Sequence, residues 1–170
     1  MRCEVREKTY ETPCGAIHYW TNERAGAPAS LVFLPGLTAD HRLFDRQICC
    51  FEAKYRVLVW DAPAHAASWP FDFSFTLRDQ ARYARISGHG FRMLAEAMEA
   101  DLPYELRCPA LLICGERDRA GSCVRYNRAW HRRTGIPIRW IKGAGHNANT
   151  DAPEEVNRLI EAFVSGLSRG

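Results

Sequence analysis

The fold is decided by residues 109–118, which read Pro-Ala-Leu-Leu-Ile-Cys-Gly-Glu-Arg-Asp. The apolar part of this stretch is typical of a strand that is buried on both faces of a parallel sheet. Its last residue, Asp118, is therefore expected in a loop at the carboxyl end of a strand. A second apolar run, residues 136–141, leads into Gly143-Ala144-Gly145-His146-Asn147. Active groups of open α/β sheets collect at this edge, so Asp118 and His146 are candidate site residues.

Outward from this stretch, apolar runs alternate with segments of helical composition. Residues 3–12 and 16–20 predict an N-terminal hairpin, and further buried strands are expected at residues 31–34 and 55–60. Helices are expected at residues 41–51 (with Asp40 as N-cap), 77–84, 91–98, 122–134 and from 151 onward. The alternation predicts an α/β fold, with helices on both faces of a mostly parallel sheet.

Length and composition indicate one globular domain. The chain has 170 residues, of which 46% are hydrophobic, and this is enough for a real core. We expect a single domain over residues 1–170, with an N-terminal half (1–81) and a C-terminal half (82–170).

The charge and hydropathy patterns exclude several partner classes. The net charge of +3 gives no reason to expect nucleic-acid binding, and Arg128–Arg133 are predicted to form a solvated helix face. No apolar run reaches the roughly 18 residues that a membrane span needs. Residues 1–8 are charged and contain no apolar signal core. We therefore expect a cytoplasmic protein that binds neither nucleic acid nor membrane.

The cysteine and histidine spacings give no sign of a metal site. The seven cysteines include no Cys-x-x-Cys pair, so we expect reduced and mostly buried thiols. His131, His146 and Asp151 match no known ligand spacing. The sequence thus predicts no metal and no cofactor.

Four short motifs, in chain order, resemble those of α/β-hydrolases. The first is Leu34-Pro35-Gly36-Leu37, and the second is residues 61–68, which read Asp-Ala-Pro-Ala-His-Ala-Ala-Ser. The third is the Asp118 loop and the fourth is the His146 loop. In the second motif, alanines stand at 64 and 66 where these hydrolases usually have glycine, so a positive φ at either position would strain the turn.

The resemblance implies a role for each of these residues. Gly36 and Leu37 would form the oxyanion loop, with the backbone N–H of Leu37 as the donor. Asp118 would orient His146, and His146 would act as the base of a serine hydrolase that cleaves small carboxylic esters.

The serine nucleophile that this chemistry requires is not recognisable. In the resembled family it stands on a strand-to-helix G-x-S-x-G elbow, upstream of the acid. The seven serines include one in Gly166-Leu167-Ser168-Arg169-Gly170, but no strand precedes it. Before the strand that leads into Asp118, the interval that begins at His65 contains no apolar strand-like run, as if the central elbow strand and the lid were deleted near Arg82. We expect the remaining sheet either to close up or to pair with a second copy of the chain, as a homodimer.

Two classes of function remain open. The first is a weakly active or inactive ester hydrolase that acts on a small ester-like substrate and recruits Ser87 or a cysteine within reach of His146. The second is a non-catalytic pseudoenzyme, a binding module or a truncated hydrolase product. The aromatic residues 69–75 would line a ligand cleft or pack in the core, and core packing is the favoured interpretation.

Overall fold

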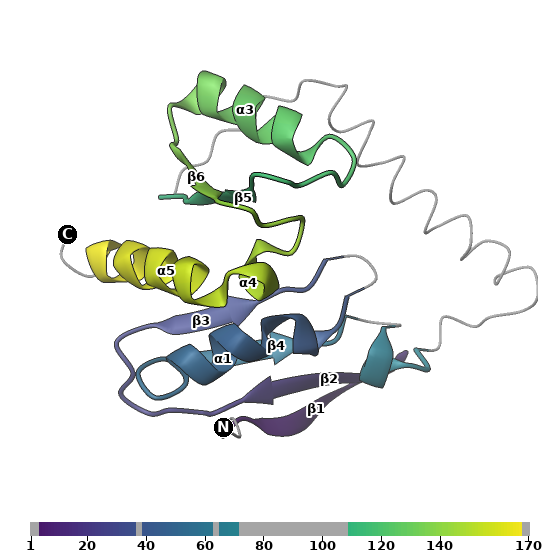
Figure 1. Cartoon of the computed structure of the whole chain (residues 1–170). Coiled ribbons are helices and arrows are strands. Elements are labelled where there is room, and N and C mark those ends of the chain that lie inside the picture. Colours follow the sequence, from purple (N-terminus) through teal and green to yellow (C-terminus); the bar gives the residue numbers. More distant parts are fainter. Residues whose placement is uncertain (1–3, 37–38, 63–64, 72–108, 168–170) are drawn as a thin grey trace, which may run out of the picture.

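The computed structural model describes residues 4–36, 39–62, 65–71 and 109–167 (Figure 1). Its strands are β1 (Arg6–Thr12), β2 (Gly15–Thr21), β3 (Ser30–Phe33), β4 (Arg56–Trp60), β5 (Leu112–Gly115) and β6 (Ile138–Ile141). Its helices are η1 (His41–Phe44), α1 (Asp45–Phe51), η2 (Ala66–Ser68), α3 (Cys123–Thr134), α4 (Ala148–Asp151) and α5 (Pro153–Leu167), where η marks a 3-10 helix. The α/β class is confirmed.

The described strands form two sheets. A four-stranded sheet has the order β1-β2-β4-β3, and β5 pairs with β6 in a second sheet. The pairs β3–β4 and β5–β6 are parallel, whereas β1–β2 and β2–β4 are antiparallel. The antiparallel β1–β2 pair follows from the predicted hairpin, because the short turn after Thr12 reverses the chain. The four-stranded sheet therefore contains both parallel and antiparallel pairs.

The core of the first sheet lies on β4 and α1. Val57 and Val59 are fully buried, and Ile48 and Phe51 of α1 pack against them. This confirms the buried strand that was expected at residues 55–60.

Strand β3 is less buried than its apolar sequence predicts. Phe33 is buried, but Val32 is 57% exposed and Leu34 is 62% exposed. The prediction that this strand is buried on both faces is therefore wrong. The reason is its position: β3 is the last strand of its sheet in the described part of the chain, with β4 as its neighbour.

Helix α5 packs against both sheets. Its Val156 belongs to a second buried cluster with Ile141, Ala144 and Ala148. Ile160, one turn further along, packs against this cluster and also against the core of the first sheet. In Figure 1, α5 lies between β3 and the β5–β6 pair, with α3 on the opposite side of that pair. The terminal helix therefore joins the two sheets.

Local signals explain where several helices begin and end. Asp40 accepts a hydrogen bond from the backbone N–H of Arg42 at 2.9 Å, as expected for the N-cap of a helix. The first turn of that helix is a 3-10 turn, and the α-helix begins at Asp45. Helix α3 ends at Gly135, whose φ of +74° favours glycine.

Several predictions fall outside the described residues. These are the helices at 77–84 and 91–98, the deletion near Arg82, the oxyanion donor Leu37, and the roles considered for Ala64, Ser87 and Ser168. No helix in the described ranges has both the length and the apolar character that a membrane crossing requires.

The cysteines differ from the expectation of reduced, mostly buried thiols. Cys49 is disulfide-bonded. Of the four free cysteines in the described ranges, Cys114 is buried, Cys14 and Cys123 are half-buried, and Cys50 is exposed. Spacing along a sequence does not determine cysteine pairing, because the fold decides which thiols meet.

Candidate active site

The structure brings Asp118 and His146 together. The Nδ1 atom of His146 lies 3.1 Å from the Oδ2 atom of Asp118. The side chain of Asp118 is only 6% exposed, whereas that of His146 is 57% exposed. The other carboxylate oxygen, Oδ1, accepts a hydrogen bond from the backbone N–H of Ala120 at 2.8 Å. A nearly buried carboxylate thus orients an imidazole whose outer part is open to solvent.

The two loops meet because they follow neighbouring parallel strands. Glu116 donates its backbone N–H to the carbonyl of Ile141 at 3.0 Å, and Arg117 donates to the carbonyl of Ala144 at 2.8 Å. Gly115 permits this approach, since a Cβ atom there would lie 2.1 Å from the carbonyl oxygen of Gly145. Backbone contact between the loops therefore sets the distance from acid to histidine.

A buried amide connects the histidine loop to the first half of the chain. Gln47 of α1 is 1% exposed, and its Nε2 donates to the carbonyl of Asn149 at 3.0 Å. In return, Nδ2 of Asn149 donates to Oε1 of Gln47 at 3.2 Å and to the carbonyl of Leu43 at 2.7 Å. The sequence analysis did not identify Gln47 or Asn149, since a single polar residue in a helix gives no sign of a partner 102 residues away.

A carboxylate also fixes the turn before the histidine. Asp151, in the last position of α4, accepts a hydrogen bond from the backbone N–H of Gly145 at 2.7 Å. Asp151 had been considered as a metal ligand from its spacing. Its contact with the backbone gives it a structural role in holding His146 in place.

Of the expected oxyanion loop, only Gly36 is described. Its carbonyl accepts a hydrogen bond from the backbone N–H of Ala39 at 3.2 Å. Leu37, the expected donor, lies outside the described ranges. The oxyanion role of both residues stays a prediction.

A second histidine–carboxylate pair lies in the first half of the chain. Asp61 is completely buried, and its Oδ1 accepts from the backbone N–H of His41 at 2.8 Å and lies 2.9 Å from Nδ1 of the same residue. Its Oδ2 accepts from the backbone N–H of Ala67 at 3.0 Å. The ring of His41 stacks on Trp20 with the centroids 3.6 Å apart. Asp61 thus fastens η1 and η2 to the end of β4.

The turn that contains Ala66 has the conformation that glycine favours. The φ of Ala66 is +41°, in the left-handed region that costs a residue with a Cβ atom roughly 1–2 kcal/mol. The sequence analysis made strain conditional on a positive φ at position 64 or 66. For Ala66 this condition is met.

The thiol of Cys123 lies next to the acid–histidine pair. In the described part of the chain, three potential ligand atoms lie within 4.8 Å of one another, one each from Asp118, Cys123 and His146. Burial, and next the nearby carboxylate of Asp118, raise the pKa of the Cys123 thiol. A thiol with a raised pKa is a poor nucleophile at neutral pH. The raised pKa of Cys123 therefore does not support this thiol as the nucleophile.

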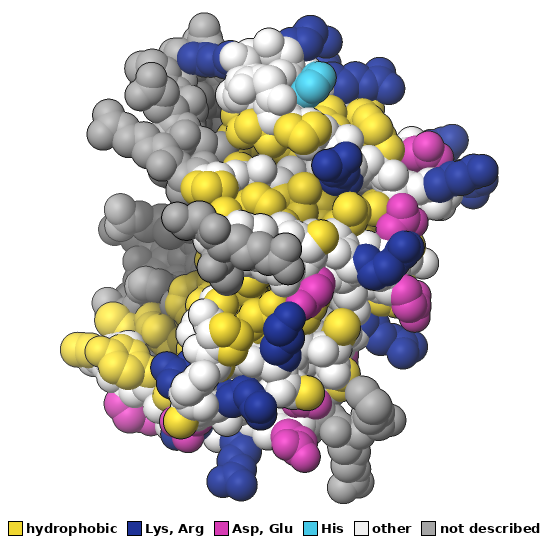
Figure 2. All heavy atoms as spheres, turned by 90° about the vertical axis from the view of Figure 1, so that its left-hand side faces the viewer, with side chains coloured by type: hydrophobic (Ala, Val, Ile, Leu, Met, Phe, Trp, Pro, Cys, Tyr) yellow, Lys and Arg dark blue, Asp and Glu magenta, His cyan; other side chains and the backbone are white. Residues whose placement is uncertain are grey.

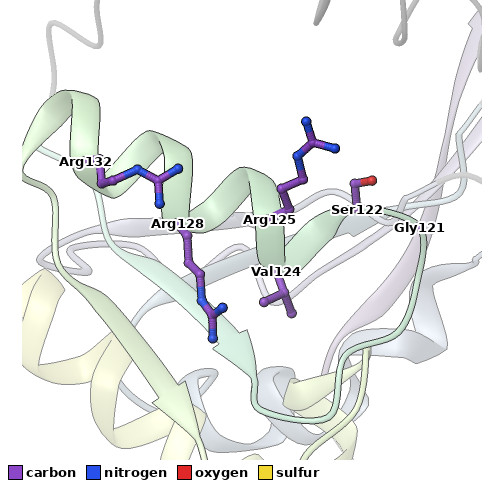
Figure 3. Close-up of a pocket in the computed structure, with 6 residues that line it drawn as sticks. All are labelled: Gly121, Ser122, Val124, Arg125, Arg128 and Arg132. Carbon is purple, nitrogen blue, oxygen red and sulfur yellow. The ribbon is translucent and has the colours of Figure 1, made fainter.

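A basic hollow lies along α3. It has a volume of about 420 Å³ and is lined by Gly121, Ser122, Val124, Arg125, Arg128 and Arg132 (Figure 3). The guanidinium of Arg128 lies 5.4 Å from the ring centroid of Trp140 on β6. The arginine side chains in Figure 3 extend in different directions from the helix. This arrangement fits a solvated helix face with one arginine over an aromatic ring.

Comparison with known proteins finds similar folds but no similar sequence. No protein-family model matches the sequence, and no curated protein does. A CIB-like hydrolase from Thermoplasma acidophilum is 14% identical, with 94% of this chain and 97% of that chain covered and a TM-score of 0.67. The carboxylesterase CesB from Bacillus subtilis is 16% identical, with 96% and 92% covered and a TM-score of 0.62.

A third solved structure is similar over nearly the whole of this chain. A membrane phospholipase A, described as a bacterial virulence factor, is 16% identical, with 99% of this chain and 88% of that chain covered and a TM-score of 0.69. These similarities of fold agree with the parallel β5–β6 pair and with the contact between Asp118 and His146. The chain has the α/β-hydrolase fold.

Proposed function

We propose that this protein is related to the carboxylic ester hydrolases and keeps the acid and base of their triad, Asp118 and His146, without the serine nucleophile. The consequence is weak ester hydrolysis or none. The observation that supports the proposal is the 3.1 Å contact between His146 Nδ1 and Asp118 Oδ2 at the ends of adjacent parallel strands.

The geometry favours a base that acts on water. With Nδ1 next to the carboxylate, the remaining ring nitrogen, Nε2, accepts the proton of a water molecule as the water oxygen attacks the ester carbonyl. Asp118 keeps the proton on Nδ1 and stabilises the imidazolium that forms. The proton then passes from Nε2 to the departing alkoxide. Because no acyl-enzyme forms by this route, one difficult step is not divided into two easier ones, and the rate is low.

A non-catalytic role is the second candidate, and a specific observation favours it. The side chain of His146 is 57% exposed, whereas catalytic electrostatics are strongest in a site that excludes water. A pseudoenzyme, a binding module or a truncated hydrolase product would all retain the loops for structural reasons.

The experiment is intact-mass analysis after treatment with a fluorophosphonate, combined with hydrolysis of a small activated ester. The variants are His146→Ala and the matched control His131→Ala, which removes an exposed histidine of α3. The proposal predicts no covalent adduct and a slow hydrolysis that His146→Ala abolishes and His131→Ala preserves. An adduct that depends on His146 would reveal a working serine and overturn the absence of a nucleophile.

The ester assay also separates the two candidates. Hydrolysis equal to the buffer rate, on protein whose circular dichroism shows it to be folded, would favour the non-catalytic role. Hydrolysis that survives His146→Ala would contradict the proposed role of this residue.

A further inference from the structure

We propose that Asp118, Cys123 and His146 form a binding site for a zinc ion. The three side chains supply a carboxylate oxygen, a thiol sulfur and an imidazole nitrogen, and these are the donor atoms that zinc prefers in proteins. Among the described residues, these three form a group of potential metal ligands, because one ligand atom of each lies within 4.8 Å of the other two. The site goes beyond ester hydrolysis, since it does not depend on any activity of the chain.

The acid–histidine pair already has the separation of two ligands on one ion. Zinc–nitrogen and zinc–oxygen bonds of about 2.0–2.1 Å place two ligand atoms of a tetrahedron about 3.3 Å apart. The Nδ1 of His146 and the Oδ2 of Asp118 are 3.1 Å apart. The two atoms are therefore already at the separation that one ion requires, and a turn of the imidazole ring would direct Nδ1 at an ion beside the line between them.

Cys123 completes the protein ligands. With a zinc–sulfur bond of about 2.3 Å, its sulfur would lie about 3.5 Å from the other two ligand atoms, compared with the present upper limit of 4.8 Å. Cys123 is the first residue of α3 and is half-buried, so a change of side-chain rotamer supplies the remaining movement of about 1 Å. The exposed side of His146 leaves the fourth position to water.

The charges balance when the ion binds. The thiol of Cys123 gives up its proton to solvent, and the neutral ring of His146 loses its proton from Nδ1 and takes one from solvent on Nε2, so that Nδ1 is free to bind the ion. One thiolate and one carboxylate then neutralise the two positive charges of zinc. The sequence analysis missed this site, because Cys123 lies five residues after Asp118 and 23 before His146, and this spacing fits no known zinc motif.

Zinc and the proposed base exclude each other. An ion on Nδ1 of His146 separates the ring from Asp118, so the carboxylate no longer orients the imidazole. This consequence rests on the proposed function, whereas zinc binding itself does not. Zinc is therefore expected to suppress any hydrolysis that depends on His146.

The direct test is a cobalt titration of the full chain, freed of metal under conditions that keep the disulfide of Cys49 intact. We expect one Co²⁺ per chain, a thiolate-to-cobalt absorption band in the near ultraviolet, and loss of the band on addition of Zn²⁺. Cys123→Ser should remove the band and weaken Zn²⁺ binding in calorimetry at least about tenfold. The control Cys14→Ser, which alters another half-buried free thiol, should leave both unchanged.

Two further variants keep the test decisive. Cys123→Asp replaces sulfur by oxygen, so it should keep one bound Zn²⁺ and lose the band, while His146→Ala should weaken binding and His131→Ala should not. A band that survives Cys123→Ser, or a folded chain that binds no Co²⁺, overturns the zinc site. Ester hydrolysis of the metal-free protein is measured separately. A chain that binds zinc but hydrolyses no ester after removal of the metal would favour the non-catalytic candidate and leave the zinc site unaffected.

Discussion

Gly115 and Gly145 approach each other so closely that a Cβ atom on Gly115 would lie 2.1 Å from the carbonyl oxygen of Gly145. A second carbonyl, that of Ala144, would lie 2.5 Å away. Both obstacles are backbone, so neither can swing aside as a flexible side chain would. This contact holds the Asp118 loop against the His146 loop.

Gly115→Ala is therefore expected to separate the acid from the histidine. Forcing a methyl group into a packed site costs about 1–3 kcal/mol of unfolding free energy, measurable by urea denaturation. The ring signals of His146 in an NMR spectrum should move at the same time. Gly166→Ala is the control, because a Cβ there meets nothing within 4 Å and alanine stabilises a helix by up to about 1 kcal/mol relative to glycine. Equal stability of the two variants would contradict the close approach.

Asp61→Asn should destabilise the first half of the chain. The buried carboxylate faces three N–H groups, two from His41 and one from Ala67, and an asparagine NH₂ would face at least one of them without an acceptor. A buried donor left unsatisfied costs about 1–3 kcal/mol, which thermal unfolding would detect. Asp40→Asn is the matched control: asparagine caps helices as well as aspartate, so its melting temperature should stay near that of the parent. If Asp61→Asn left the melting temperature unchanged, the hydrogen bonds of Asp61 would contribute no net stability.

Ala66→Gly should stabilise the protein. Glycine adopts a φ of +41° without the steric cost that alanine pays there. After the loss of chain entropy, the expected gain is about 0.5–1 kcal/mol in chemical denaturation. Ala67→Gly, at the next exposed position, has no positive φ to relieve and should destabilise. If both variants lose stability, the turn is not strained.

The exposed apolar residues of β3 predict association of two chains. In the described part of the chain, β3 is the last strand of the four-stranded sheet; its Val32 is 57% exposed, and Leu34, which directly follows it, is 62% exposed. An apolar strand edge without a neighbour favours pairing with another chain. Figure 2 shows hydrophobic side chains in several areas of one face of the molecule, with both basic and acidic side chains around them.

Light scattering on the full chain is the measurement of this association. We expect twice the chain mass of 19.4 kDa, reduced to the monomer by Val32→Lys. Tyr10→Lys, on β1 at the opposite edge of the same sheet and 65% exposed, should leave the dimer intact. A strictly monomeric parent protein would exclude pairing through β3.

The sequence by itself determined the α/β class, the hairpin and the strand that was expected at residues 55–60. These follow from local signals: apolar runs specify strands, a capping Asp40 and a terminal Gly135 delimit helices, and loops after parallel strands share one edge. Each of them is encoded within a few neighbouring residues.

The tertiary structure alone decided which distant groups meet. It placed Cys123 beside the acid–histidine pair, joined the halves through Gln47 and Asn149, and gave Asp61 the backbone of η2 as a partner. It also left β3 exposed, although its composition is that of an interior strand. The physical reason is that burial and hydrogen bonding depend on what packs alongside an element, and that neighbour comes from elsewhere in the chain.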